Sequence, residues 1–341
     1  MGEIAKRSDD ITDAMWQEVN KFNRDMVKEF LEYKVELSEQ TKVQYRSNLR
    51  IFFWWVKENL GDKDCINIKK KEFIRYLNWL TNRGLSDSAI KIKKSAVSSL
   101  CNYIMEYYEE EYPTFRPFVT SSMKVVKTGY VHEKQPLTPD ELEDLYKKLE
   151  ELGKWQILAY VKFSYSSAAR RGETRQILKE VAEYEPIERE ITYIDEDGTE
   201  QKGVSRSYLT HIVRAKGRSV EGKRRKLKFD QDAMDAIKKW LEVRGEDDCP
   251  YLFVTKGKDG KYHQIGVATF NEWCSGLITQ LVGRRCFSHI WRESRATNLV
   301  VYEHKSPKVA QKLLGHESVE TTETSYIIRD DSCDESDEAF L

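Results

Sequence analysis

This chain of 341 residues has almost no net charge, no closely spaced pair of cysteines and no long apolar run. Its 56 basic and 57 acidic residues nearly cancel, so the formal charge of −1 indicates no class of partner. None of its six cysteines lies at Cys-x-x-Cys spacing, so the sequence suggests neither a zinc site nor a redox pair. No apolar run approaches the roughly 18 residues of a membrane-spanning helix. We therefore expect no metal site and no membrane span.

The first ten residues are charged and lack the apolar stretch of a signal peptide. We therefore expect a cytoplasmic protein whose thiols stay reduced and are either buried or incidental. Internal repeats and low-complexity tracts are also missing, except for an acidic tail. This tail, residues 330–341, carries six acidic residues and no basic one.

Basic residues are concentrated in two stretches, although the total charge is near zero. Residues 41–100 carry 13 Lys or Arg against 5 Asp or Glu, a net of +8. Residues 200–228 carry 10 against 2, again +8. A basic patch is the usual electrostatic footprint of a DNA-binding protein. Each stretch taken alone fits a solvated helix face equally well.

Apolar periodicity predicts a mainly α-helical chain with a small antiparallel β-sheet, organised as two domains. The predicted parts are a disordered N-terminus (1–12), a helical domain (13–118), a linker (119–135), a second domain (136–329) and the acidic tail (330–341).

The first domain is predicted as a small helical unit that is basic on its outside. The expected helices are 13–37, 40–60, 69–83 and 86–108. Adjacent aromatic residues at positions 52–55 resemble a stacking platform for bases, but we interpret them as packing layers of the core. The exposed lysines are the better candidates for phosphate contacts: Lys69, Lys70, Lys71, Lys91, Lys93 and Lys94.

The second domain begins with a capping box, in which Thr138 precedes Pro139 and Glu141. Its pattern predicts two hairpins, 191–203 and a long basic one at 208–229. The predicted helices are 155–165, 232–243, 269–282, 288–303, 307–314 and 321–329.

Side chains suited to phosphodiester chemistry gather in the last quarter of the chain. His289 and Arg292 lie at i and i+3, on one face of a predicted helix. Gly315 is a predicted helix stop, His316 follows it in a turn, and Tyr326 lies ten positions after His316. Arginine neutralises phosphate charge, imidazole moves protons near neutral pH and a phenol can form a covalent intermediate.

This order of motifs resembles the tyrosine recombinase, or phage integrase, family. That family also has an arginine in a pattern such as Gly-x-Arg-x-x-Glu, which Arg170 and Glu173 match, and a lysine in a hairpin turn, which Lys216 matches. The resemblance spans about half the chain. It implies a helical core-binding domain joined to a mixed α/β catalytic domain, which together clamp duplex DNA.

The resemblance also implies roles for these side chains. Arg170 and Arg292 would bind the scissile phosphate, with Arg171 as an alternative to the first, and two guanidinium groups suit the charge of a pentacoordinate phosphorus. Lys216 would protonate the departing 5′ oxygen, with Lys223 in the same turn as its rival. The basic residues of this turn also become candidate DNA contacts: Arg218, Lys223 and Arg224.

His289 would accept the proton of the nucleophile, His316 would hold the phosphate and Tyr326 would attack the phosphorus. No ATP, metal or other cofactor is implied. Family members commonly place the tyrosine nine residues after the Leu-Gly-His histidine, where this chain has Ser325. One extra loop residue would restore the register. If the nucleophile has instead been lost, the chain is a sequence-specific DNA-binding regulator on a recombinase fold.

By this resemblance, the protein cuts and rejoins duplex DNA at specific sites through a 3′-phosphotyrosine intermediate. The implied partners are duplex DNA, further copies of the chain as a dimer to tetramer on DNA, and an accessory DNA-bending or directionality factor. The implied setting is a phage or mobile element in a bacterial or archaeal cell. A topoisomerase-like relaxing enzyme shares the residue set but normally acts as a monomer.

Overall fold

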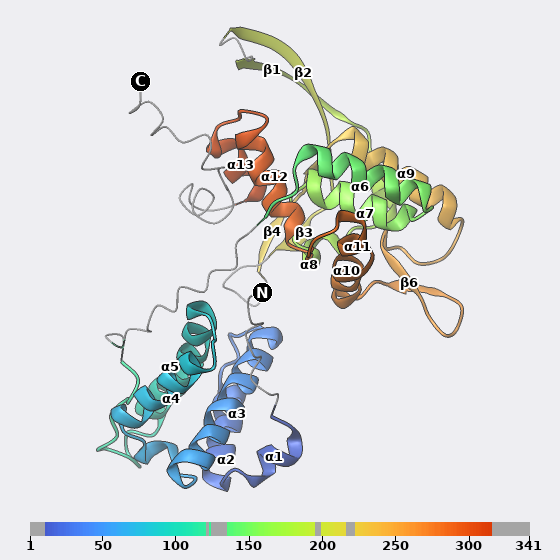
Figure 1. The fold of residues 1–341 in the computed structure, drawn as a ribbon. Coiled ribbons are helices and arrows are strands. Elements are labelled where there is room, and N and C mark those ends of the chain that lie inside the picture. Colours follow the sequence, from blue (N-terminus) through green and yellow to red (C-terminus); the bar gives the residue numbers. More distant parts are fainter. Residues whose placement is uncertain (1–10, 121–122, 124–134, 195–198, 216–221, 316–341) are drawn as a thin grey trace. The chain divides into compact units, whose positions relative to one another are not determined.

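The computed structural model describes residues 11–120, 123, 135–194, 199–215 and 222–315 (Figure 1). The chain divides into two compact units, Met1–Glu133 and Lys134–Leu341. The N-terminal residues 1–10, the predicted last helix 321–329 and the acidic tail lie outside the described residues.

The described residues of the first unit form α-helices, the loops that connect them and one 3-10 turn at Cys65–Asn67. Its helices are α1 (Asp13–Glu18), α2 (Lys21–Tyr33), α3 (Glu39–Leu60), α4 (Lys70–Asn82) and α5 (Asp87–Tyr107).

Capping side chains set the ends of these helices. Ser38 and Ser86 accept hydrogen bonds from the backbone N–H groups of the first turns of α3 and α5. Gly61 ends α3 in the left-handed conformation, with φ of 64°. The single helix predicted over 13–37 is wrong, because Asn20 caps a new helix by accepting the N–H of Asn23 at 2.8 Å.

Aromatic side chains fill the core of the first unit. Phe52 and Phe53 are fully buried, and the ring centroid of Phe52 lies 5.0 Å from that of Tyr76 on α4. Trp55 is also buried and packs 5.4 Å from the same tyrosine. The interpretation of positions 52–55 as packing layers is therefore confirmed for these three side chains, while Trp54 is half-buried beside Lys57.

The second unit contains the remaining helices and all of the described strands. Its helices are α6 (Pro139–Glu151), α7 (Trp155–Ser166), α8 (Arg171–Thr174), α9 (Gln231–Arg244), α10 (Val267–Trp273), α11 (Thr279–Val282), α12 (Ile290–Val301) and α13 (Pro307–Leu314). A 3-10 helix at Lys179–Glu183 and a π-helical segment at Cys274–Ile278 complete the set. The predicted helix 269–282 is therefore divided by this π segment.

The strands form small antiparallel sheets with the order β1-β2-β5, β3-β4 and β6-β7. They are β1 (Ile187–Ile194), β2 (Glu200–Leu209), β3 (Val213–Ala215), β4 (Lys223–Arg225), β5 (Lys228–Phe229), β6 (Val254–Lys256) and β7 (Tyr262–Gln264).

The hairpin predicted over 208–229 exists, but it is broken into two pieces. The end of β2 pairs with β5, so that Tyr208 lies opposite Phe229, and β3 pairs separately with β4. The β6-β7 hairpin was not predicted, because its strands have only three residues each and too little alternation to stand out.

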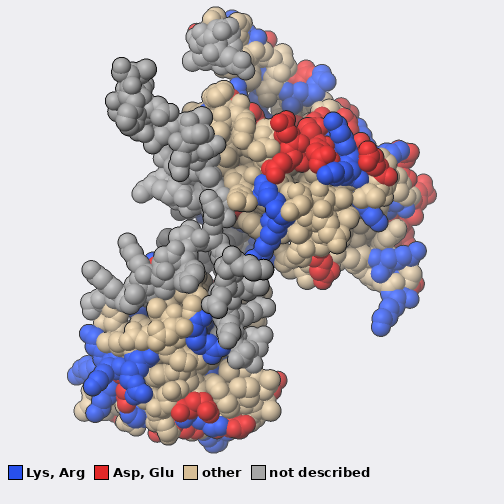
Figure 2. Space-filling model, viewed as in Figure 1, with Lys and Arg blue, Asp and Glu red and all other residues tan. Residues whose placement is uncertain are grey.

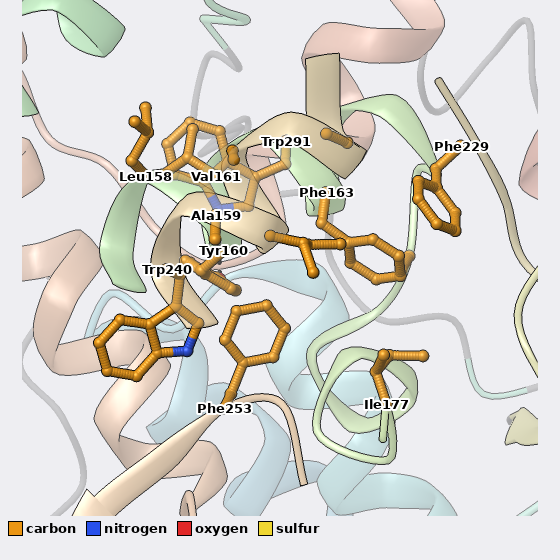
Figure 3. Packing of buried hydrophobic residues seen from close by; sticks show 14 of the residues in the cluster. Leu158, Ala159, Tyr160, Val161, Phe163, Ile177, Phe229, Trp240, Phe253 and Trp291 are labelled. Carbon is orange, nitrogen blue, oxygen red and sulfur yellow. Dashed lines mark hydrogen bonds between the residues drawn. The ribbon is translucent and has the colours of Figure 1, made fainter. Parts of the chain in front are cut away.

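Helix α7 runs through the core of the second unit (Figure 3). Tyr160 stacks on Phe270 at 4.5 Å between ring centroids and accepts a hydrogen bond from the indole of Trp291 at 3.2 Å. Helix α12 also packs on α7, and Asn298 of α12 donates to the hydroxyl of Tyr165 at 3.0 Å. These contacts fix α12 and the end of α7 against each other, and both carry candidate site residues.

The capping box at Thr138 is confirmed, since Thr138 and Glu141 each accept a backbone N–H from the other. No helix among the described residues is long and apolar enough to cross a membrane. Five cysteines are described, and each is a free thiol.

Candidate active site

An unusual backbone turn after α7 positions Arg170. Ala168 is fully buried and has φ of +49°, a backbone conformation that residues other than glycine rarely adopt. Two residues later, Arg170 caps the short helix α8 in an extended conformation. Backbone strain of this kind persists only where the surroundings hold it, and it is concentrated at functional sites.

Glu173 lies at the centre of a cluster of arginines. Only 2% of its side chain is exposed. It accepts the backbone N–H of Arg170 at 2.9 Å and the Arg170 guanidinium at 3.2 Å. The guanidinium of Arg225, on β4, donates at 2.6 Å to Oε2, the oxygen that also accepts the backbone N–H of Arg170. Burial favours the neutral acid, but Arg225 and Arg170 outweigh it and keep the pKa of Glu173 below its ordinary value.

Arg292 is a fully buried arginine on α12. It donates to the carbonyl oxygen of Ala168 at 2.7 Å and to that of Leu314 at 2.6 Å. The first bond ties α12 to the strained turn before Arg170. The second ties α12 to the last residue of α13.

The end of α13 is held by two arginines at once. Arg225 donates to the carbonyl of Leu314 at 3.0 Å, beside the bond from Arg292. Cations at a helix C-terminus satisfy carbonyls that have no partner in the helix and oppose the helix dipole. Gly315 then turns the chain with φ of 66°, and a Cβ there would lie 2.7 Å from Nη1 of Arg225. The positive φ favours glycine at this position, and the short distance shows how closely the guanidinium of Arg225 lies against the turn.

The structure therefore gathers Arg170, Arg225 and Arg292 around one buried carboxylate, that of Glu173, and one helix end. Three cations and one anion leave a net charge of +2, which suits a phosphodiester. Arg170 keeps 29% of its side chain exposed. Arg171, the alternative, is exposed on α8, whereas the ion pair with Glu173 belongs to Arg170.

His289 directly precedes α12 and is half-buried. Its carbonyl accepts the N–H of Glu293 at 3.2 Å, so the turn that carries it continues into the helix of Arg292. Ser288, its neighbour, donates to the side chain of Asn271 at 2.7 Å and anchors this turn to α10. The predicted i, i+3 spacing therefore lies on one continuous helical turn.

Lys216, Arg218, His316 and Tyr326 lie outside the described residues. Lys223 was expected in the same turn as Lys216, and this was wrong. It begins strand β4 and is exposed, because the antiparallel ladder of β3 and β4 continues as far as the pair Ala215–Lys223.

The lysines proposed for phosphate contacts do not share one environment. Figure 2 shows Lys and Arg gathered on the first unit over α4 and α5, and Lys69, Lys70, Lys71 and Lys91 are exposed there. Lys93 is instead only 8% exposed, and its ammonium group donates to Asn48 at 3.0 Å. The interpretation of Lys93 as an exposed phosphate contact is therefore wrong, since its side chain lies on the apolar face of α5.

Lys94, the last of these lysines, is half-buried and donates to the carbonyl of Met123. Arg224, on β4, is exposed like Lys223. Both side chains are therefore accessible, and their contact with DNA stays a prediction.

Arg225 is the site residue that sequence reasoning missed. It lies in a run of basic residues, and the family resemblance assigns a role to a lysine in the turn before it, not to Arg225. A signal was nevertheless present, because Arg225 alternates with the buried Leu227 and Phe229 while Lys226 and Lys228 are exposed. An arginine in phase with core residues of a strand points inward and needs a partner.

Among the described residues, no group of three or more His, Cys, Asp or Glu side chains is placed to hold a metal ion. Burial raises the pKa of the Cys101 and Cys274 thiols to about 12 each, which disfavours their reactive thiolate forms.

Comparison with known proteins identifies both units. The family described as "Phage integrase family" matches residues 135–332, and "Phage integrase, N-terminal SAM-like domain" matches residues 27–106. The SPbeta prophage-derived recombinase-like protein YomM of Bacillus subtilis (strain 168) is 32% identical over 325 residues. That alignment covers 94% of this chain and 92% of YomM.

Solved structures share the fold at low sequence identity. The Tn1549 transposon integrase in complex with transposon right end DNA has a TM-score of 0.64 at 15% identity, over 94% of this chain and 99% of that one. A lambda integrase dimer bound to a COC′ core site has a TM-score of 0.59 at 16% identity, over 92% of this chain and 78% of that one.

These matches confirm the fold class, in which a helical core-binding domain precedes a catalytic domain with small antiparallel sheets. The catalytic match alone covers more than half of the chain, and YomM is related over nearly all of it. The chain therefore belongs to the phage integrase family of tyrosine recombinases.

Proposed function

We propose that this recombinase cuts and rejoins duplex DNA at specific sites through a 3′-phosphotyrosine intermediate. The observation that carries the proposal is the cluster of Arg170, Arg225 and Arg292. Arg170 and Arg225 share the Glu173 carboxylate, and Arg225 and Arg292 share the carbonyl of Leu314 at the end of α13. Arg170 and Arg292 are the residues that bind the phosphate. Their charge stabilises the pentacoordinate transition state more than the ground state, because the transition state carries more negative charge.

The proposed chemistry conserves the number of phosphodiester bonds. The Tyr326 oxygen attacks the phosphorus, its proton passes to His289, and His316 donates a hydrogen bond to the phosphate. The bond from phosphorus to the 5′ oxygen breaks, and Lys216 protonates that oxygen. The products are a 3′-phosphotyrosine and a free 5′ hydroxyl. Rejoining is the reverse reaction with a 5′ hydroxyl from another strand.

Both units supply basic surface for the duplex. In the first unit this surface is the set of exposed lysines on α4 and α5, and in the second it is β4 with Lys223 and Arg224. We propose that several copies assemble on DNA, as a dimer to tetramer, with an accessory bending or directionality factor. The lambda integrase structures, a dimer on a core site and a tetramer on a Holliday junction, are precedents for such assembly.

A suicide substrate tests the proposal. Duplexes that bind the protein are first selected from a random pool, and each is then nicked so that cleavage releases a short fragment and prevents rejoining. The proposal predicts a covalent protein–DNA complex that survives denaturation for the wild type and is lost for Arg292→Lys, which keeps the charge but not the two-pronged geometry. Equal complex formation by both proteins would contradict it.

A DNA-binding regulator is the second candidate, and one observation favours it. Ser325, not a tyrosine, stands nine residues after His316. If the selected duplexes bind tightly and specifically but none forms a covalent complex, the regulator replaces the recombinase as the proposed function.

A further inference from the structure

Arg225 contacts both the carboxylate that Arg170 binds and the helix end that Arg292 binds. It lies on β4 opposite Val213, and 19% of its side chain is exposed. Its Nη2 atom donates to Glu173 at 2.6 Å. Its Nη1 atom donates to the carbonyl oxygens of Leu314 at 3.0 Å and of Leu313 at 3.4 Å.

These contacts connect three separate segments through one guanidinium group. Glu173 belongs to the helix that follows Arg170, and Leu313 and Leu314 form the last turn of α13. The residue after this turn is Gly315, whose Cα lies so close to Arg225 that a Cβ would meet Nη1 at 2.7 Å. The Gly315 turn thus lies directly against this guanidinium.

We infer that Arg225 is a positioning residue for the reaction. It holds the end of α13, and with it the Leu314–Gly315 turn that leads directly into His316, at a fixed place relative to Arg170. The inference rests on the proposed function, in which His316 and Arg170 act on the same phosphate. Arg225 acts through these residues and is not itself proposed to touch DNA.

Arginine is required for this task because of its geometry. One planar guanidinium donates in two directions, to the Glu173 carboxylate and to the carbonyls of α13. A lysine ammonium group is a single point on a flexible chain and reaches one of these partners at a time. Lysine at this position therefore keeps the charge near Glu173 but loosens the helix end.

Hydrogen exchange tests the positioning directly, without any cleavage. Arg225→Met removes the guanidinium, and Arg225→Lys keeps the charge. Arg206→Met is the matched control, because Arg206 also pairs with a glutamate, Glu188, at 2.9 Å, but that pair is exposed. We expect amides of residues 311–315 to exchange at least about tenfold faster in Arg225→Met. They should exchange less fast in Arg225→Lys, and at the wild-type rate in Arg206→Met.

Single-turnover cleavage at saturating duplex then tests the function of this positioning. A displacement of about 1 Å costs about a hundredfold in rate, so Arg225→Met should cleave about a hundredfold more slowly while binding DNA with unchanged affinity. Arg225→Lys should be intermediate. In a His316→Ala background the same Arg225→Met change should cost less than about threefold, because the group that it positions is already absent.

The outcomes separate the two proposals. Unchanged exchange at residues 311–315 in Arg225→Met would overturn the positioning role, and so would a full hundredfold loss in the His316→Ala background. A wild-type protein that forms no covalent complex with any selected duplex would overturn the proposed function. The exchange measurement would still decide whether Arg225 holds the end of α13.

Discussion

Replacing Glu173 by glutamine tests whether the arginine cluster stabilises the second unit. The change keeps the size and shape of the side chain and removes only its charge. Glu173 is 2% exposed and accepts three hydrogen bonds, two from Arg170 and one from Arg225. The glutamine oxygen can still accept from the backbone N–H of Arg170 and from Arg225. The amide NH2 group of the glutamine then faces the Arg170 guanidinium, so that two hydrogen-bond donors oppose each other and this hydrogen bond is lost.

The expected cost follows from these contacts. One charge-assisted bond is lost, at about 1.5 to 3 kcal/mol, and the bond from Arg225 is weakened. The side chains of Arg170 and Arg225 are 29% and 19% exposed, so hydrogen bonds to water replace part of the interaction that they lose. We therefore expect a loss of about 2 to 3 kcal/mol, below the ~3–5 kcal/mol of a fully buried broken pair. For a unit of about 200 residues this lowers Tm by about 4 to 12 °C.

Scanning calorimetry at several pH values is the appropriate assay. The pKa of Glu173 lies below its ordinary value in the folded state, so its contribution to stability is present above the unfolded pKa of about 4.3. That contribution is lost as the pH falls through the folded pKa. The Tm difference between wild type and Glu173→Gln should therefore be full at pH 7 and shrink below about pH 4.

Glu188→Gln is the matched control for this experiment. Glu188 also pairs with an arginine, Arg206, but the two side chains are 51% and 58% exposed, so the pair is worth less than about 1 kcal/mol. If Glu173→Gln shifts Tm no more than Glu188→Gln does, the cluster does not stabilise the unit. A difference that grows at acidic pH would contradict the assigned protonation of Glu173.

Three further changes test other parts of the account. Arg170→Ala should lower strand cleavage at least about a hundredfold, since loss of one transition-state contact costs ~3 kcal/mol, while gel shifts show nearly unchanged DNA binding. DNA affinity should fall steeply with salt, and the double change Lys70→Glu with Lys91→Glu should lower affinity broadly and reduce the log–log slope by about two. A flat salt dependence would refute the DNA clamp. Gly315→Ala should destabilise the second unit by at least about 1 kcal/mol in urea unfolding, because alanine is strained at φ of 66° and its Cβ would displace the guanidinium of Arg225. Wild-type stability would mean that the turn is not fixed.

The helices were largely predictable because their signals are local. Ser86 and Gly61 mark helix ends by capping chemistry, and the apolar period of 3.6 fixes which face is buried. The break at Asn20 was missed because the apolar period continues across it, while a cap depends on the single side chain that accepts the N–H. The π segment at Cys274–Ile278 was missed for a similar reason, since it alters hydrogen bonding without altering composition.

Only those site residues that belong to motifs of defined order and spacing were predictable from the sequence. Arg170 and Arg292 were found from motif spacing, and the structure links both to the end of α13 through Ala168, Glu173 and Leu314. Arg225 belongs to the same cluster but has no motif, because its partners come from segments about 50 and 90 residues away. Long-range pairing of this kind depends on the assembled fold.

The most direct test of the central claim is to identify the residue that becomes attached to DNA. The covalent complex formed on a nicked duplex is digested with protease, and the peptide bearing the nucleotide is sequenced by mass spectrometry. We predict attachment through Tyr326, loss of the complex in Tyr326→Phe and its retention in Ser325→Ala, because the Tyr326 phenol is the proposed nucleophile. Attachment through any other residue, or a complex that persists in Tyr326→Phe, would contradict it.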